Sequence, residues 1–279
     1  MPEGDTVWRA GRQLHEALAG RPLTRSDFRV PRYAATDLTG LTVTEVVSRG
    51  KHLLARLAPE PGRPAVTVHT HLRMDGYWQI RRAGYPPRDH RVRLVLANRD
   101  WQAIGYLLGV VEVLSAAREE QAVGHLGPDL LGPDWDEAEA VRRLAAAPDR
   151  PVGEALLDQR NLAGIGNVYK AEVLFLRGLS PWRPAGSVTD LVALAGLAQR
   201  LLAANTGRAG HITTGNLTRG EENWVYGRAG LPCRRCGTPV AVDGQGRAGT
   251  AAGERITYWC PSCQPWPAQP WPAQPWPIP

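Results

Sequence analysis

The stretch DQRNLAGIGNVYKAEVLF, residues 158–175, places a Gly-Ile-Gly-Asn turn between two segments with the apolar spacing of helices. Gly164 and Gly166 end the first helix, and Asn167 stands where the N-cap of the second helix is expected. Backbone N–H groups at the start of a helix point toward its positive end and form a site for a phosphate. A plain tight turn between packed helices has the same pattern, so the turn alone does not decide the function.

Helical periodicity continues on both sides of this turn. Three further segments carry apolar residues at helical spacing, namely 134–147, 150–159 and 189–205. Segments rich in Pro and Gly separate them. Residues from about 117 to 204 therefore predict a helical domain.

The preceding part of the chain has a different pattern. Between residue 22 and about residue 115, short runs rich in Val, Leu, Thr and aromatic residues alternate with Gly, Pro, Asp and Asn, which predicts a β-sandwich or barrel. An amphipathic helix is predicted over residues 4–19, capped by Asp5 or Thr6 and ended by Gly20. The order of strands and then helices predicts an α+β protein with separate domains.

Two CxxC pairs contain all four cysteines of the chain: Cys233, Cys236, Cys260 and Cys263. Two such pairs supply four thiolates, which is the ligand set of a closed, structural zinc site. Two disulfides are the alternative, but they are disfavoured in a cytoplasmic protein. The metal is expected to organise a β-hairpin over residues 237–259, which carries Arg247 and Arg255. No cysteine remains to act as a catalytic thiol.

The net charge of +6 and the pI of about 9.4 fit a polyanionic partner such as nucleic acid. A general preference for arginine is the alternative explanation, because among 33 basic residues only Lys51 and Lys170 are lysines. Lysine at these two positions suggests a need for a compact amine. No apolar run is long enough to span a membrane, and no secretion signal is visible, so a cytoplasmic protein is expected.

The chain begins MPEGDT, which places Pro2 and Glu3 at the tip of the first predicted helix. Proline in the first helical position and an early acidic residue both favour a helix start, and this is the simpler local explanation. If Met1 is removed, however, Pro2 carries a secondary amine beside a carboxyl group. The other motifs decide between the two interpretations.

The N-terminal PEG, the LAGIGNVYKAE turn and the two CxxC pairs, with VYGRAGLPCRRCG and RITYWCPSCQ, closely resemble the formamidopyrimidine-DNA glycosylase / endonuclease VIII family of base-excision repair enzymes. The resemblance runs from Met1 to about Gln264. It implies a β-sandwich with a flanking helix over 1–116 and a helix-two-turn-helix domain over 117–205. A linker and a zinc finger with a β-hairpin would follow over 206–264. DNA would lie across the cleft between the two main domains.

The last segment, residues 265–279, repeats a PWPAQ unit. Such a Pro/Trp-rich segment is expected to form a disordered tail without a catalytic role.

The family resemblance implies a bifunctional enzyme that removes an oxidised base and then nicks the strand. Pro2 would attack the sugar C1′ to form a Schiff base, and Glu3 would move protons. Lys51 would reach the lesion and an adjacent phosphate, and Arg255 would grip the phosphates beside the flipped nucleotide. One structural Zn²⁺ would hold the finger.

The resemblance also implies DNA contacts. Met74 would fill the hole that the flipped base leaves, and Arg73 flanks it. Asn167 would contact a phosphate. Four more positions match DNA contacts of the family: His90, His125, Lys170 and Arg228. For His90 a solvated loop position, and for Lys170 a surface position, explain the sequence equally well.

The substrate class depends on the branch of the family. Residues 98–114 lack the Arg-Phe pair of the formamidopyrimidine branch, and the segment at 211–224 is short for a loop that caps 8-oxoguanine. Both points and the PEGDT start favour the endonuclease VIII branch and oxidised pyrimidines, although the HLRM motif that ends at Met74 favours the other branch. An 8-oxoguanine/formamidopyrimidine-specific glycosylase and a non-catalytic DNA-binding zinc protein are the alternatives. The protein is expected to act on damaged DNA as a monomer, in the bacterial cytoplasm at the nucleoid.

Overall fold

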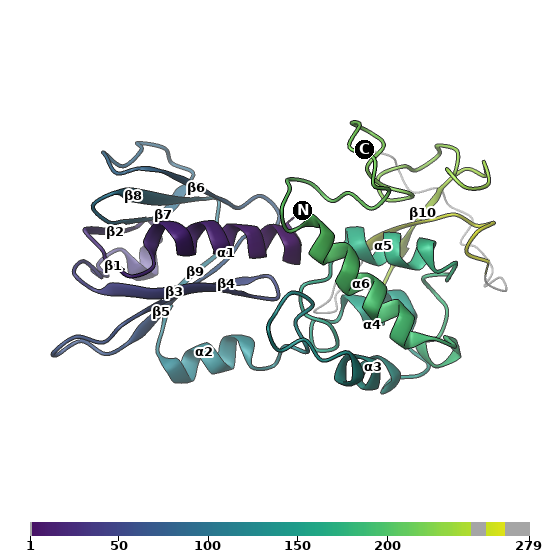
Figure 1. Cartoon of the computed structure of the whole chain (residues 1–279), viewed down its shortest axis with the longest axis horizontal. Helices are drawn as coiled ribbons and strands as arrows, with labels where there is room; N and C mark the ends of the chain where they lie inside the picture. The colour runs from purple at the N-terminus through teal and green to yellow at the C-terminus, as the bar shows by residue number, and fades with distance from the viewer. Residues whose placement is uncertain (1, 247–254, 266–279) are drawn as a thin grey trace. The chain divides into compact units, whose positions relative to one another are not determined.

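The computed structural model describes residues 2–246 and 255–265 (Figure 1). The chain forms two compact units, Met1–Pro133 and Asp134–Pro279. Helix α2 (Ala116–Val123) packs against strands β5 (Val66–His71) and β9 (Val110–Leu114), so it belongs to the first unit. The first unit therefore extends beyond the expected boundary at residue 116.

The first unit contains two antiparallel sheets, which are the two layers of the predicted sandwich. The five-stranded sheet has the order β1 (Arg21–Pro22), β3 (Thr42–Arg49), β4 (His52–Leu57), β5 (Val66–His71) and β9 (Val110–Leu114). The four-stranded sheet has the order β2 (Arg25–Phe28), β7 (Val92–Ala97), β8 (Trp101–Tyr106) and β6 (Tyr77–Arg82). A 3-10 turn, η1 (Pro31–Tyr33), follows β2.

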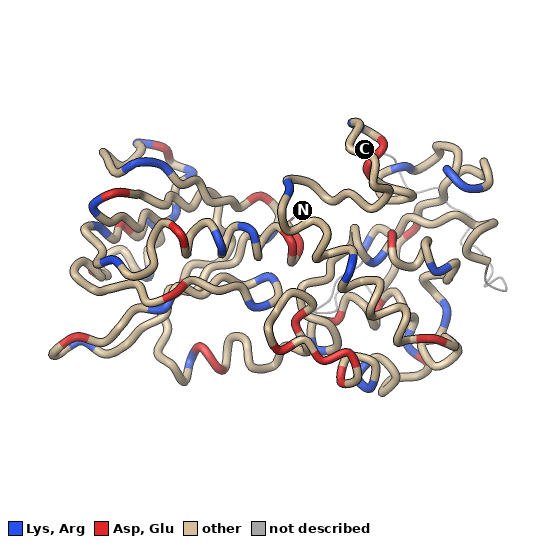
Figure 2. Tube along the Cα trace, viewed as in Figure 1, with Lys and Arg blue, Asp and Glu red and all other residues tan. Residues whose placement is uncertain are grey.

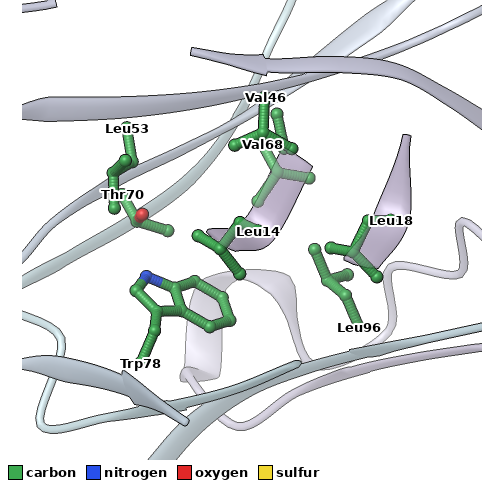
Figure 3. Close-up of a pocket in the computed structure, with 9 residues that line it drawn as sticks. Leu14, Leu18, Val46, Leu53, Val68, Thr70, Trp78 and Leu96 are labelled. Atoms are coloured by element: carbon green, nitrogen blue, oxygen red, sulfur yellow. The ribbon is translucent and has the colours of Figure 1, made fainter. Parts of the chain in front are cut away.

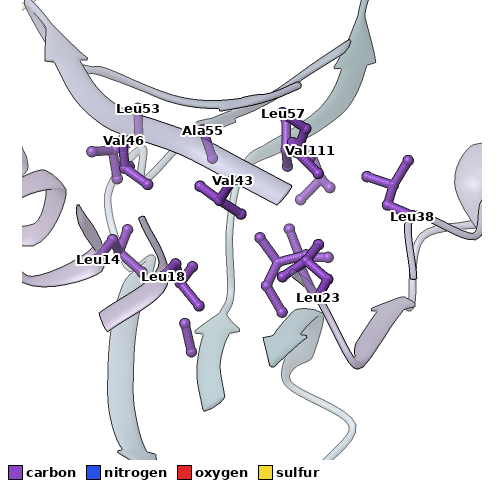
Figure 4. Packing of buried hydrophobic residues seen from close by; sticks show 14 of the residues in the cluster. Leu14, Leu18, Leu23, Leu38, Val43, Val46, Leu53, Ala55, Leu57 and Val111 are labelled. Atoms are coloured by element: carbon purple, nitrogen blue, oxygen red, sulfur yellow. The ribbon is translucent and has the colours of Figure 1, made fainter. Parts of the chain in front are cut away.

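Helix α1 (Gly4–Leu18) supplies one side of the core of this unit. Its buried Leu14 and Leu18 face Val43 and Val46 of β3 (Figure 4). Between the helix and the sheets lies a small, mostly apolar cavity that Trp78 closes on one side (Figure 3). The cavity results from core packing and holds no group suited to catalysis.

This helix begins at the predicted residue and ends at Leu18, one residue before the predicted end, but its predicted cap is wrong. Glu3 occupies the N-cap, so Asp5 and Thr6 already lie within the helix. Gly20 follows the helix with φ of 73°, a conformation that glycine adopts without strain, as expected for a helix end.

The second unit contains the predicted helices α3 (Glu137–Ala145), α4 (Val152–Leu157), α5 (Asn167–Leu176) and α6 (Leu191–Asn205). A 3-10 turn, η2 (Ala185–Ser187), precedes α6. Strands β10 (Ala241–Gln245) and β11 (Arg255–Trp259) form the expected hairpin and share this unit with the helices. Gly166, not Asn167, is the N-cap of α5, so the expected cap is one residue out.

Two expectations fall on residues outside the described ranges. Arg247 lies between the described parts of the hairpin, and the tail from Trp266 onward follows the last described residue. Of the helices in the described ranges, none combines the length and apolar character that crossing a bilayer requires.

Candidate active site

Four connections of the first unit meet at one end of its sandwich. In the five-stranded sheet, Arg49 pairs with His52, His52 with His71, and His71 with Val110. The β3–β4 turn, the β5–β6 loop and the β8–β9 turn therefore leave the sheet at the same end. The β6–β7 loop returns there too, because Leu107 N–H donates to the carbonyl of Arg91 at 2.8 Å.

Helix α1 runs antiparallel to β3, which brings its N-terminus to this same end. Val46 N–H donates to His15 Nδ1 at 3.1 Å, and beyond the helix Gly20 N–H donates to the Val43 carbonyl at 2.8 Å. Residue numbers rise along the helix as they fall along the strand. The start of the helix therefore lies beside the end of β3.

Both elements continue beyond this contact toward the same end of the unit. Gly11 lies against Ser48, where an added Cβ would be 3.5 Å from the Ser48 nitrogen. From Gly11 back to Gly4 the helix spans ~10 Å, and only Arg49 separates Ser48 from the turn formed by Gly50 and Lys51. The N-terminus of α1 and the turn that carries Lys51 therefore lie at the same end of the sandwich.

Pro2 and Glu3 lie at this N-terminus. Pro2 is half-buried, whereas Glu3 is fully buried, with none of its surface exposed. The Glu3 carbonyl accepts from Val7 N–H at 3.0 Å and forms the first turn of the helix, while the carboxyl group makes no capping bond. The backbone therefore fixes the position of Glu3, and its carboxyl group is not used to cap the helix.

Lys51 is half-buried and directly precedes β4, as predicted. Gly50 before it has φ of 57°, a left-handed conformation that glycine tolerates. Its N–H donates to Asp129 Oδ2 at 2.7 Å, and Arg49 Nη2 donates to the Gly127 carbonyl at 3.0 Å. The segment after α2 thus holds the Lys51 turn in place.

Met74 is 55% exposed at the tip of the β5–β6 loop, which confirms its predicted exposure. Arg73 has φ of 55°, and its N–H donates to His71 Nδ1 at 2.9 Å. An added Cβ on Gly109 would lie 2.1 Å from Arg73 Cγ, so the Arg73 side chain covers that glycine. These contacts fix the loop beneath a protruding methionine.

Sequence reasoning missed three histidines beside these loops. His52 Nδ1 lies 2.8 Å from His69 Nε2, and His69 Nδ1 lies 2.9 Å from Glu112 Oε2. The His71 ring meets the His52 ring edge-on, with centroids 4.9 Å apart. The alternation in VTVHTH, residues 66–71, was the available signal, because it places His69 and His71 on one face of β5.

Burial keeps two of these histidines neutral. It lowers the pKa of His52 to about 3 and that of His71 to about 4. The positive charges of Arg73 and Lys51 act in the same direction on His71. At neutral pH, His71 Nδ1 therefore keeps the lone pair that accepts from Arg73.

His90 and His125, two other predicted contacts, also lie at this end of the first unit. His90 precedes Arg91, which is bonded to the β8–β9 turn, and its side chain is 95% exposed. His125 is exposed and close enough to His52 to lower the pKa of that histidine. Their DNA contacts remain predictions.

In the second unit, α5 and β11 hold the other predicted residues. Asn167 Nδ2 donates to the Ile256 carbonyl at 2.7 Å, next to the exposed Arg255. Lys170 is fully buried, and its Nζ donates to Thr257 Oγ1 at 2.6 Å. The predictions that Lys170 is a surface residue or contacts DNA are therefore wrong, because its amine is enclosed within the fold.

Glu172, another residue that sequence reasoning missed, anchors the segment before the cysteines. Its buried carboxylate accepts from the N–H groups of Trp224, Val225 and Tyr226 at 2.8–2.9 Å, and from the Thr213 hydroxyl. Burial raises the pKa of Glu172, and these hydrogen bonds oppose the rise. A charged residue in the apolar run of α5 was the available signal.

Arg228 follows this anchored segment. Its guanidinium is half-buried and donates to the carbonyls of Trp224 at 2.8 Å and Pro232 at 3.1 Å. Burial lowers its pKa. These bonds give Arg228 a role inside the fold, and its contact with DNA remains a prediction.

The four cysteine sulfurs lie within 4.8 Å of one another. Cys233 Sγ is 4.0 Å from Cys263 Sγ, and Cys236 Sγ is 3.4 Å from Cys260 Sγ, so neither pair is disulfide-bonded. Thiolates around tetrahedral zinc are separated by about 3.8 Å, given Zn–S bonds of about 2.3 Å. The arrangement fits a metal and contradicts the two-disulfide alternative.

The basic charge of the chain does not by itself mark a DNA-binding surface. Lys and Arg are spread along both units and alternate with acidic residues (Figure 2). Several arginines are paired with carboxylates, as Arg56 is with Glu45 and Glu119. The loops at the end of the sandwich are therefore identified by their geometry, not by net charge.

The comparisons with known proteins agree with this arrangement. The model of the formamidopyrimidine-DNA glycosylase N-terminal domain matches residues 1–104, and that of the formamidopyrimidine-DNA glycosylase H2TH domain matches residues 126–205. The chain belongs to the formamidopyrimidine-DNA glycosylase / endonuclease VIII family. The predicted family is thereby confirmed.

Relatives place the chain in the endonuclease VIII-like branch. A protein of Streptomyces coelicolor named probable endonuclease 8 2 is 57% identical over 275 residues, covering 96% of this chain and 95% of that protein. One of Mycolicibacterium smegmatis named DNA-(apurinic or apyrimidinic site) lyase Nei2 is 48% identical over 264 residues, covering 95% and 99%. The branch predicted from the sequence is confirmed.

Solved structures confirm the fold. The structure described as a complex between the Lactococcus lactis Fpg and an abasic site containing DNA aligns with a TM-score of 0.75 and 24% identity. The alignment covers 95% of this chain and 100% of that one. The α+β fold with an N-terminal β-sandwich and a helix-two-turn-helix region is thus confirmed.

We expect Gly76→Ala to disturb the Met74 loop. An added Cβ would lie 2.4 Å from the Leu72 carbonyl oxygen, so the backbone must shift. The free energy of unfolding, measured by urea denaturation, should fall by about 1–3 kcal/mol. Gly207→Ala is the matched control, because an added Cβ there meets no atom within 4 Å. Equal losses in the two variants would contradict the proposed tight packing of the loop.

Proposed function

We propose that the protein is a bifunctional DNA glycosylase and abasic-site lyase of base-excision repair that uses the Pro2 amine as its nucleophile. The proposal rests on three features that lie together at one end of the first unit: the Pro-Glu N-terminus, the Lys51 turn and the exposed Met74. The names of the relatives, endonuclease 8 and abasic-site lyase, support the same activity.

The reaction begins at the amine that removal of Met1 exposes. The Pro2 nitrogen attacks the sugar C1′, the bond between C1′ and the base breaks, and the base leaves with a proton. The bond between C1′ and the ring oxygen then breaks, Glu3 gives a proton to that oxygen, and an iminium cation forms between C1′ and the Pro2 nitrogen. A proton acceptor in the site then removes a C2′ proton, which expels the 3′ phosphate and breaks the strand.

Helix α1 favours this nucleophile electrostatically. Pro2 lies at the N-terminus of a 15-residue helix, where the helix dipole contributes a partial positive charge. That charge disfavours the protonated ammonium form and leaves more of the amine neutral. The buried Asp5 in the first turn limits the effect.

Glu3 and Lys51 would supply the proton transfer and the electrostatic support. The Glu3 carboxyl group is fully buried, so bulk water does not compete for its protons. Lys51 lies at the same end of the sandwich as the start of α1, on a turn that Asp129 holds. We assign Glu3 to moving protons at the sugar and Lys51 to the lesion and its phosphate.

The remaining residues would hold the DNA. Met74, on its fixed loop, enters the space that the flipped base vacates, and Arg73 lies beside it. In the second unit, Arg255 and the backbone at the start of α5 contact phosphates. The Asn167 side chain is already bonded to Ile256, so its backbone N–H is the group available for a phosphate.

We assign Zn²⁺ to the four cysteines in a structural role. With four thiolates as ligands, the metal would have no open position for substrate, so it would stabilise the finger and take no part in the reaction. We further propose that the protein acts as a monomer on damaged DNA in the bacterial cytoplasm. The DNA complexes among the solved relatives support DNA as the partner.

Borohydride trapping on an abasic-site duplex tests the proposal. The protein lacking Met1 should form a covalent adduct, because the reagent reduces the iminium. Pro2→Gly should lose most of the adduct, and Glu3→Gln should slow base excision by about a hundredfold or more. Arg12→Ala, an exposed change on the same helix, is the control.

The non-catalytic alternative gives a different result. A processed protein that binds the duplex without cross-linking would contradict the enzyme proposal and support a DNA-binding zinc protein. Protein that keeps Met1 should give no adduct, since its Pro2 nitrogen is then part of an amide.

We propose oxidised pyrimidines as the substrate class. The segment before VYGR is held tightly, because Thr213 and Thr214 N–H groups both donate to the Glu222 carbonyl. Such a short loop leaves little chain to enclose a purine. Dihydrouracil should therefore be excised faster than 8-oxoguanine paired with cytosine under single-turnover conditions. The reverse order would identify the protein as an 8-oxoguanine glycosylase.

A further inference from the structure

Lys170 is the less obvious of the two lysines in this arginine-rich chain. It lies on α5 with none of its surface exposed. Burying an ammonium group costs several kcal/mol unless good hydrogen bonds compensate. The groups around the amine must therefore compensate for the loss of water.

The amine connects α5 to both strands of the finger hairpin. Lys170 Nζ donates to Thr257 Oγ1 of β11 at 2.6 Å, and Gln245 Oε1 of β10 lies 3.5 Å away. Thr257 Oγ1 in turn donates to Gln245 Oε1 at 3.2 Å, and Gln245 Nε2 donates to the Pro181 carbonyl at 2.7 Å. Both strand residues are buried, so the group is a closed polar cluster.

These contacts surround Arg255 on its strand and across the hairpin. Gln245 is the residue paired with Arg255 in the β10–β11 register, and Thr257 is its neighbour on the same face of β11. Ile256, between Arg255 and Thr257 on β11, is held by Asn167, which lies one helical turn before Lys170 on α5. The strand that presents Arg255 is thus attached to α5 at two consecutive residues, Ile256 and Thr257, and the same amine lies beside Gln245 on the partner strand.

We propose that Lys170 is a positioning residue that sets the location of Arg255 by fixing the hairpin to α5. The inference rests on the proposed function, in which Arg255 grips the phosphates of damaged DNA. A guanidinium would not replace the amine. The surroundings are closed, since a Cβ added to Gly153 would lie 2.5 Å from Gln245 Oε1.

A double-mutant cycle with Arg255→Ala tests this role. Lys170→Met should lower the single-turnover rate of base excision by about tenfold or more, because small displacements of a substrate-positioning group are costly. In the Arg255→Ala background the same change should have little further effect, since Lys170 acts through Arg255. Lys170→Arg should not restore the rate. Arg200→Met, on the exposed side of α6, is the control.

Hydrogen exchange separates this inference from the proposed function. Amides of residues 256–258 should exchange faster in Lys170→Met than in the wild type or in Arg200→Met, whether or not the protein excises bases. If Lys170→Met does not fold, Thr257→Val removes the same bond with little change of shape. If the Lys170→Met or Thr257→Val variant excises bases and exchanges these amides at wild-type rates, the proposal is overturned. It is also overturned if the loss of excision rate in Lys170→Met adds fully to the loss in Arg255→Ala.

Discussion

The antiparallel packing of α1 on β3 is the contact on which the candidate site depends. Gly11 allows the helix to approach the strand closely, and the bonds from Val46 to His15 and from Gly20 to Val43 fix its direction. Without this packing, a proline and a glutamate at the tip of a helix would simply start that helix. With it, they lie at the same end of the sandwich as a lysine turn that is distant in the sequence.

Buried polar groups fix the functional segments of both units. In the first unit, Asp129 holds the Lys51 turn and His71 holds the loop below Met74. In the second, Glu172 and Lys170 hold the segments that carry Arg228 and Arg255. Polar contacts have defined directions, whereas apolar packing is less specific, so these bonds fix where each loop ends.

The sequence was sufficient to predict most helices and strands, because their apolar residues recur with periods of 3.6 and 2. It also predicted the cysteine cluster and the exposure of Met74. It did not predict the bonds of Glu172, Lys170 or His69, because their partners lie far along the chain and meet only in the folded protein. The Lys170 prediction failed for this reason: a helix pattern does not reveal that a hairpin covers that face.

The identity of the amine that bonds to the sugar is the most direct test of the account. Tryptic peptides of the borohydride-trapped complex, analysed by mass spectrometry, would show which residue carries the reduced sugar. We expect the sugar on the N-terminal peptide, at the Pro2 nitrogen. A sugar attached to the peptide that contains Lys51 or Lys170 would contradict it.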